Sequence, residues 1–169
     1  MKPLKPEIIE MPPLKMATIT SKGDPNTSAQ DQMKALYGTV YTLKFDLKKR
    51  GLETFKVEGL RARWPDAHLV PKDQWTAYWA LPVPEETDVL PQKFPDHPVG
   101  VETWEYGTVA QVLHLGPYSE EGPTIELLHA FIEESGYDKA GPHEEEYLTM
   151  PTAKVPKTII RYQVRKKEL

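Results

Sequence analysis

The chain has 169 residues, of which 39% are hydrophobic and 27% charged, proportions typical of a folded soluble domain and not of a disordered segment. Its net charge is −4 and no basic run is longer than three residues, so direct binding to DNA or RNA is not expected. Cysteine is absent, which excludes disulfides and thiolate sites, and no segment is apolar enough for a signal peptide or a membrane span, so a cytoplasmic protein is predicted.

The first half of the chain predicts the order strand, helix, strand, strand. Residues 16–20 form a short β-like segment that ends at a Gly-Asp-Pro turn. A helix of about 20 residues follows, since its apolar residues recur at a 3.6-residue spacing. Thr27-Ser28 is its expected N-cap and Gly51 its expected end. Residues 55–64 and 75–81 are the predicted strands, each stopped by a proline.

The second half repeats this order. Residues 108–115 predict a strand that Gly116-Pro117 interrupts, and the helix that follows has an apolar stripe and ends at Gly136. Residues 144–150 and 157–164 are the remaining strands. The repetition indicates an internal duplication.

The duplication sets the expected domain organisation. A Pro-rich lead covers residues 1–15, and a single domain over 16–165 contains the repeats 16–82 and 108–165, a Pro-rich linker at 83–107 and a charged tail at 166–169. Each β-α-β-β unit is too small to bury its own sheet well. We therefore expect an α+β fold in which the two units form a pseudo-twofold antiparallel sheet, with helices on one face and a central ligand groove.

Aromatic side chains form the first set of candidate binding residues. They offer large, rigid contact areas that suit hydrophobic, planar or cationic ligands. The candidates are Trp64, Trp79, Trp104, Tyr41 and Tyr118. A place in the hydrophobic core is the alternative for any one of them, and we expect at least two to line the groove.

The acidic strand Glu144-Glu145-Glu146-Tyr147 supplies the second set. Alternation places Glu145 and Tyr147 on one face, and if Leu148 points toward the helices, these two residues face the groove. A carboxylate in an aromatic cleft would anchor a cation or act as a general base, with Tyr147 as a hydrogen-bond donor. The alternative is an exposed acidic edge, which Glu144 and Glu146 fit better than Glu145.

Other chemistry is not indicated. The five histidines show neither HxH nor HExxH spacing, and only His143 lies beside a run of carboxylates, so neither a metal site nor a cofactor is predicted. There is no GxSxG motif and no glycine-rich nucleotide loop. Glu120 and Glu121 already place negative charge at the start of the second helix, which argues against an anion site there.

Three segments carry a resemblance to a known family: LHLGPYSEEGPTIELLHAFIEESG, GPHEEEYLTMP and KTIIRYQV. They resemble the GyrI-like small-molecule-binding domain, which is also the effector domain of AraC- and MerR-type multidrug regulators. The resemblance is specific over about 108–165 and holds in element order for the first half. It implies a duplicated fold whose groove binds hydrophobic, often cationic or planar compounds, with Glu145 as the main polar anchor and Tyr147 beside it.

Three functions stay open. The first is binding or sequestering of such small molecules, as in multidrug or xenobiotic resistance. The second, implied by some stand-alone members of the family, is hydrolysis of cyclopropanoid alkylating natural products, with Glu145 activating water and Tyr147 or a Trp orienting the electrophile. The third is an inhibitor or interaction module with an unidentified protein partner, as in family members that inhibit a topoisomerase.

Overall fold

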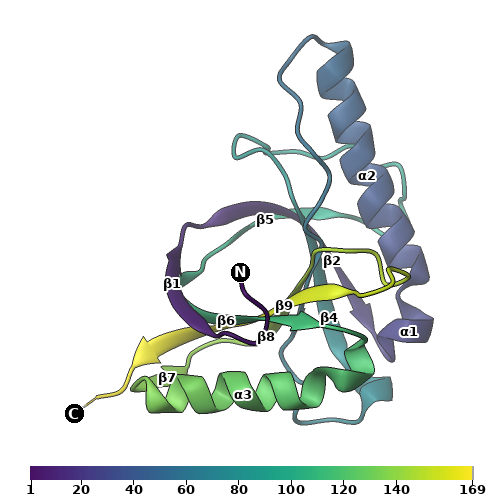
Figure 1. Cartoon of the computed structure of the whole chain (residues 1–169). Coiled ribbons are helices and arrows are strands. Elements are labelled where there is room, and N and C mark those ends of the chain that lie inside the picture. The colour runs from purple at the N-terminus through teal and green to yellow at the C-terminus, as the bar shows by residue number, and fades with distance from the viewer. Residues whose placement is uncertain (169) are drawn as a thin grey trace. The chain divides into compact units, whose positions relative to one another are not determined.

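The computed structural model describes residues 1–168, and the chain divides into two compact units. Unit 1 contains Met1–Pro12 together with the chain from Tyr106 onward, and unit 2 is Pro13–Glu105. Figure 1 shows the elements of both units, which we describe separately. No helix in the described part of the chain is both long and apolar enough to cross a bilayer.

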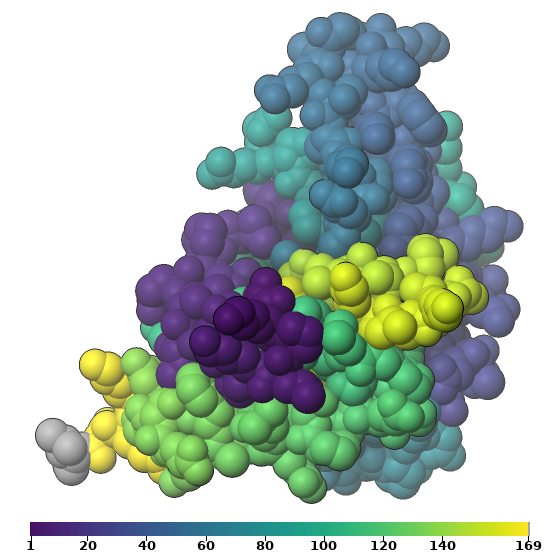
Figure 2. Space-filling model, in the orientation of Figure 1, coloured from purple at the N-terminus to yellow at the C-terminus, as the bar shows by residue number. Residues whose placement is uncertain are grey.

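The sheet of unit 1 is antiparallel. Its strands lie in the order β1 (Glu7–Met11), β6 (Gly107–Leu115), β9 (Lys157–Lys166) and β8 (His143–Tyr147). The short β7 (Tyr137–Lys139) pairs with the end of β9. The N-terminal β1 and the C-terminal β9 thus pair with opposite edges of β6, and in Figure 2 the purple N-terminal residues cover part of the green surface.

One helix covers a face of this sheet. A 3₁₀ turn, η2 (Tyr118–Glu120), leads into α3 (Glu121–Glu134), which runs along the strands in Figure 1. Its apolar side is buried because residues one turn apart face the strands. Leu128 and Ile132 belong to a buried core with Val112, Ile160 and residues around them. This packing fixes α3 against β6 and β9.

Unit 2 has its own antiparallel sheet. The strand order is β3 (Arg61–Trp64), β4 (Thr76–Pro82), β2 (Leu14–Lys22) and β5 (Gly100–Trp104). The long helix α2 (Gln30–Lys49) contacts β2 and β4. Two short helices, α1 (Pro25–Ser28) and η1 (Lys72–Gln74), occupy the connections.

The boundaries of α2 test the two expected caps. Its end is confirmed at Gly51, which has φ of +69° and donates its N–H to the carbonyl of Lys48 at 3.0 Å. The expected Thr27-Ser28 cap is wrong. Asp24 caps the short helix α1 by accepting from the Asn26 N–H at 2.9 Å, and α2 begins without a side-chain cap.

The two glycine turns are equivalent in backbone conformation. Gly23 follows β2 with φ of +107°, and Gly116 follows β6 with φ of +118°. Side-chain-bearing residues rarely adopt such angles, so glycine is required at both places. The Gly-Asp-Pro turn of the first half and the Gly116-Pro117 turn of the second therefore have the same role, since each ends a strand ahead of a helix.

The α+β prediction is confirmed, and the order strand, helix, strand, strand holds in the first half, whereas in the second half the short β7 lies between α3 and the two predicted strands. Three further details differ. Residues 1–15 contain β1 and residues 83–107 contain β5, whereas both segments were expected to lack strands. The strand expected over 55–64 begins only at Arg61, because Gly59 has φ of +74°, which is incompatible with a strand.

Candidate carboxyl site in unit 1

Glu145 lies on the face of the sheet that α3 covers. It pairs with Ile160 across β8 and β9, and Ile160 is part of the core beneath the helix. Residues directly opposite each other on antiparallel strands share a face. Glu145 is only 7% exposed, whereas Leu148 is 46% exposed. The sequence-based condition that Leu148 points toward the helices is therefore wrong, and Glu145 takes that position.

Tyr147 shares this face, as alternation predicts. Its hydroxyl donates to Oε1 of Glu145 at 3.3 Å. Its ring meets that of Tyr118, from η2, edge to face with 5.6 Å between centroids. Burial, followed by the charge of Glu145, raises the pKa of both tyrosines, so each hydroxyl stays protonated as a donor. Tyr118 is 41% exposed and connects the cluster to solvent.

His143 is held between two partners. Its Nε2 lies 2.6 Å from Oε2 of Glu145, and its Nδ1 lies 2.6 Å from the hydroxyl of Tyr162. Burial lowers the pKa of His143 to about 4, so the ring is neutral at pH 7. Because an ionised carboxylate only accepts, the proton belongs on Nε2, and Nδ1 accepts from Tyr162.

Glu121, the first residue of α3, completes the cluster. Glu121 is 6% exposed, and one of its carboxyl oxygens lies within 4.8 Å of a carboxyl oxygen of Glu145. Burial and the neighbouring charge raise the pKa of Glu121 to about 9, and burial also raises that of Glu145. Oε1 of Glu121 has no hydrogen-bond partner, and within residues 1–168 no Lys or Arg side chain pairs with either carboxyl.

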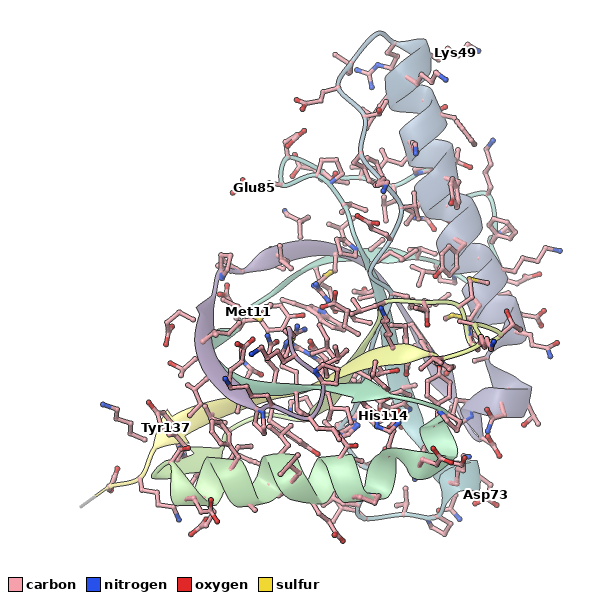
Figure 3. All side chains as sticks on the ribbon, in the orientation of Figure 1. Met11, Lys49, Asp73, Glu85, His114 and Tyr137 are labelled. Carbon is pink, nitrogen blue, oxygen red and sulfur yellow. The ribbon has the colours of Figure 1, made fainter. Side chains whose placement is uncertain are left out.

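His114 fixes the turn that carries Glu121. Its Nδ1 lies 2.8 Å from the hydroxyl of Thr124, and its Nε2 lies 3.1 Å from the carbonyl of Pro117. Since a carbonyl only accepts, Nε2 carries the proton. Figure 3 shows His114 at the end of β6 beside the first turn of α3. Through these two hydrogen bonds the imidazole of His114 connects β6 with the Gly116-Pro117 turn and with α3.

The opposite face of β8 carries a compensated ionic network. Glu144 is 2% exposed and pairs with Nη1 of Arg161 at 2.8 Å, while Tyr106 donates to the same carboxylate at 3.0 Å. Nη2 of Arg161 also reaches Glu146 at 3.1 Å. The alternative of an exposed acidic edge is therefore wrong for Glu144, which is a buried partner of a guanidinium.

Two of the tryptophan candidates pack against each other in unit 2. The rings of Trp64 and Trp79 meet edge to face at 5.8 Å, and the indole N–H of Trp79 donates to Ser21 at 2.9 Å. Both tryptophans are 7% exposed. Their contacts account for a structural role, and a role in ligand binding stays a prediction.

The other two candidates of unit 2 have different surroundings. Trp104 is 5% exposed and lies under the guanidinium of Arg63, which is 4.0 Å from its centroid. Tyr41 lies on α2, 41% exposed and stacked on Phe45. The structure thus brings together Glu145, Tyr147 and Tyr118, whereas the remaining candidates belong to the other unit.

A surface hollow of about 450 Å³ also lies in unit 2. It is lined by Lys22, Gly23, Asp66, Val70, Asp73 and Gln74. It contains no aromatic ring and does not include the buried carboxyls. Its chemistry does not match a site for planar or apolar ligands.

Glu121, His143 and Glu145 are also the residues that could hold a metal ion, since one donor atom of each lies within 4.8 Å of the others. Two donors on one zinc ion with bonds of about 2.0–2.1 Å are separated by roughly 3.3 Å. The 2.6 Å between His143 and Glu145 is shorter and is a hydrogen bond, and Tyr162 occupies the other ring nitrogen. The contacts in this cluster are protein hydrogen bonds.

Comparison with known families agrees with this architecture. Residues 4–165 match the family described as GyrI-like small molecule binding domain. The chain belongs to this family. No curated protein matches this GyrI-like chain.

Solved structures share the GyrI-like fold. An uncharacterized conserved protein from Listeria innocua has a TM-score of 0.85 at 28% identity, over 96% of this chain and 93% of that one. A hydrolase from Listeria innocua has a TM-score of 0.82 at 27% identity, over 98% and 94%. The EcmrR C-terminal domain, at 13% identity and a TM-score of 0.65 over 96% and 98%, is similar in fold alone.

Sequence reasoning missed two members of this carboxyl cluster. His143 could have been found, because alternation in His143-Glu-Glu145 places both side chains on one face. Glu121 gave no such signal. A glutamate in the first turn of a helix is ordinarily explained by the helix dipole, and only the packing of α3 brings it to Glu145.

Proposed function

We propose that this protein binds hydrophobic small molecules that carry a planar or cationic group, and that Glu145 is their polar anchor. The observation that carries the proposal is a buried pair of carboxyls without a Lys or Arg partner in the described chain. Burial of negative charge is unfavourable unless a cation or a proton compensates it. The rings of Tyr118 and Tyr147 beside the pair supply aromatic contact for a planar cation.

The biological role proposed for this binding is sequestration of such compounds in the cytoplasm, as in xenobiotic resistance. Membership of a small-molecule-binding family supports binding in general. Roles of Trp64, Trp79, Trp104 and Tyr41 in ligand binding are part of the proposal. Each is tested by the change in ligand affinity when the residue is replaced by Phe.

Equilibrium titration with matched dyes tests the binding proposal. Rhodamine 6G and ethidium serve as planar cations and fluorescein as the anionic control, with quenching of tryptophan fluorescence as the signal. We expect Glu145→Gln to weaken binding of the cations by about tenfold or more, because a charge-assisted contact contributes about 1.5–3 kcal/mol. Glu126→Gln, an exposed change on α3, is the matched control. Absence of binding across the panel, or equal affinity in Glu145→Gln, contradicts the proposal.

A second candidate function is hydrolysis. It is favoured by the similarity over 98% of this chain to a structure described as a hydrolase, and by the contacts of Glu145 with His143 and Tyr147. In this candidate Glu145 takes a proton from water and Tyr147 orients the electrophile. The substrates proposed from the family resemblance are cyclopropanoid alkylating compounds.

Mass spectrometry distinguishes the two candidates. Wild type and Glu145→Gln are incubated with a cyclopropanoid alkylating agent, and the ring-opened water adduct is measured. Adduct formed by wild type and not by the variant supports hydrolysis. Intact agent in both samples, together with measurable binding, leaves the protein a binder and excludes turnover of this substrate.

A further inference from the structure

Glu121 and Glu145 are two buried residues with one carboxyl oxygen of each within 4.8 Å of the other, and two carboxylates so close cannot both ionise near neutral pH. We propose that Glu121 and Glu145 share a single proton and form an acid–base pair, in which Glu121 donates to an oxygen of the substrate while Glu145 takes a proton from water. The catalytic part of this inference rests on the hydrolase candidate. The shared proton is independent of that candidate.

The surroundings of the pair decide which carboxyl holds the proton. Glu145 accepts from His143 at 2.6 Å and from Tyr147 at 3.3 Å, and both bonds stabilise its ionised form. Glu121 has a buried Oε1 with no partner. A buried carboxyl oxygen without a hydrogen-bond partner is less unfavourable when the carboxyl is neutral than when it is ionised. The proton therefore belongs to Glu121, which agrees with its pKa near 9.

Within residues 1–168, no Lys or Arg side chain pairs with either carboxyl, so none replaces this proton. The titratable groups whose charges act on the pair or on its hydrogen-bond partners are His114 of β6, Tyr118 of η2, Lys139 of β7, His143, Glu144 and Tyr147 of β8, and Tyr162 of β9. The three tyrosines and His143 are neutral at pH 7, and Lys139 acts on His143 rather than on a carboxyl. Arg161 is engaged by Glu144 and Glu146 on the other face of the sheet.

The step balances without an oxidant or a further reactant. Glu145 accepts a proton from water as the water oxygen bonds to an electrophilic carbon of the substrate. The bond from that carbon to its leaving atom breaks, and the electron pair moves to a conjugated carbonyl oxygen, which takes the proton of Glu121. The substrate class is thus an electrophile activated by a conjugated carbonyl group.

The contact between the carboxyls also resets the site. After the step Glu145 is protonated and Glu121 is ionised. Because the two carboxyl groups have oxygens within 4.8 Å of each other, the proton can return from Glu145 to Glu121 over this short distance. The geometry resembles that of other carboxyl pairs in which one group acts as acid and the other as base.

The shared proton is tested without any substrate. Carbon-13 NMR of protein labelled at the glutamate side-chain carboxyls follows protonation between pH 4 and 10 in wild type, Glu121→Gln, Glu145→Gln and the control Glu126→Gln. We expect one carboxyl to stay protonated at pH 7 in wild type and in the control, and to titrate near pH 9. This resonance disappears in Glu121→Gln. Glutamine is close in size to a protonated glutamate, and the second variant, Glu145→Gln, keeps the test valid if the first does not fold.

Two results would overturn the shared proton. One is full ionisation of every glutamate at pH 7. The other is a stoichiometric divalent ion, found by metal analysis of the purified protein and lost in Glu121→Gln, since an ion would then supply the compensating charge.

The catalytic role has its own test, with the cyclopropanoid alkylating agent as the probe. Glu121→Gln should lower kcat by about 10²-fold or more, and the decline of wild-type kcat above pH 9 should vanish in the variant. Wild-type turnover with unchanged kcat in Glu121→Gln contradicts the acid role alone. No turnover in wild type refutes the catalytic role and the hydrolase candidate together, and the NMR result then stands by itself.

Discussion

Arg161 and Glu144 form an ion pair at 2.8 Å in which both side chains are almost wholly buried, 4% and 3% exposed. Removing one partner leaves the other charge buried without compensation, which costs about 3–5 kcal/mol. We expect Arg161→Met to lower the free energy of unfolding by this amount in urea titrations. Lys167→Met, which breaks the exposed contact with Glu133, is the control and should lower the free energy of unfolding much less, because solvent screens that contact. An equal decrease in the free energy of unfolding in both variants would contradict the prediction that the buried ion pair is the more costly one to break.

The stability of the protein should fall as pH rises toward 9, and Glu121 is the cause. Its pKa is about 9 in the folded chain and 4.5 in the unfolded chain, so the folded state holds a proton that the unfolded state releases between these values. The stabilisation is complete below pH 4.5 and is lost as pH rises through 9. The slope is up to about 1.4 kcal/mol per pH unit. Urea titrations at pH 5, 7 and 9 should show a shallower decline in Glu121→Gln, and parallel profiles would exclude Glu121 as the source.

His143 contributes with the opposite sign. Its pKa is about 4 when folded and 6.5 when unfolded, so the unfolded state binds the extra proton and stability falls as pH decreases from 6.5 to 4. Nitrogen-15 NMR of the imidazole should show a neutral ring down to about pH 5. We expect His143→Gln to lose less stability over this window than wild type. Titration of the ring near 6.5 would mean that burial does not control it.

Ser21 and Trp79 should make a measurable contribution to the stability of unit 2. The hydroxyl of Ser21 accepts the indole N–H at 2.9 Å, and both residues are buried. Ser21→Ala leaves this N–H without a partner at a cost of about 1–3 kcal/mol, measured by urea unfolding. Trp79→Phe removes donor and ring area together. Unchanged dye affinity in Trp79→Phe would assign this residue to the core alone and remove it from the predicted ligand contacts.

The part of the fold that follows from local pattern was predictable. The length of α2 and its end at Gly51 follow from helical periodicity and from the conformational freedom of glycine. The common face of Glu145 and Tyr147 follows from alternation. Alternation does not say which face of a strand is covered. The burial of Glu144, which forms an ion pair with Arg161, was therefore not predicted.

The contacts that depend on tertiary packing were not predictable. β1 and β5 are short and lie among prolines. β1 is a strand because it pairs with the edge of β6, and β5 is a strand because it pairs with the edge of β2. Glu121 reaches Glu145 only because the apolar side of α3 packs on the core around Ile160. No residue spacing in the sequence indicates that Glu121 lies near Glu145.

Gly116 allows the site to be recognised in other chains. With φ of +118°, and with Oε2 of Glu120 only 3.2 Å from where a Cβ would stand, this position selects glycine and so fixes the turn that delivers Glu121. The resulting signature is a Gly-Pro pair, a glutamate five positions after the glycine, and a distant His-x-Glu-x-Tyr strand. If the proposed pair exists, relatives that keep both glutamates would carry it, and relatives with glutamine at the first of them would keep the proposed binding site without the proposed acid. The signature thus sorts family members by chemistry before any of them is assayed.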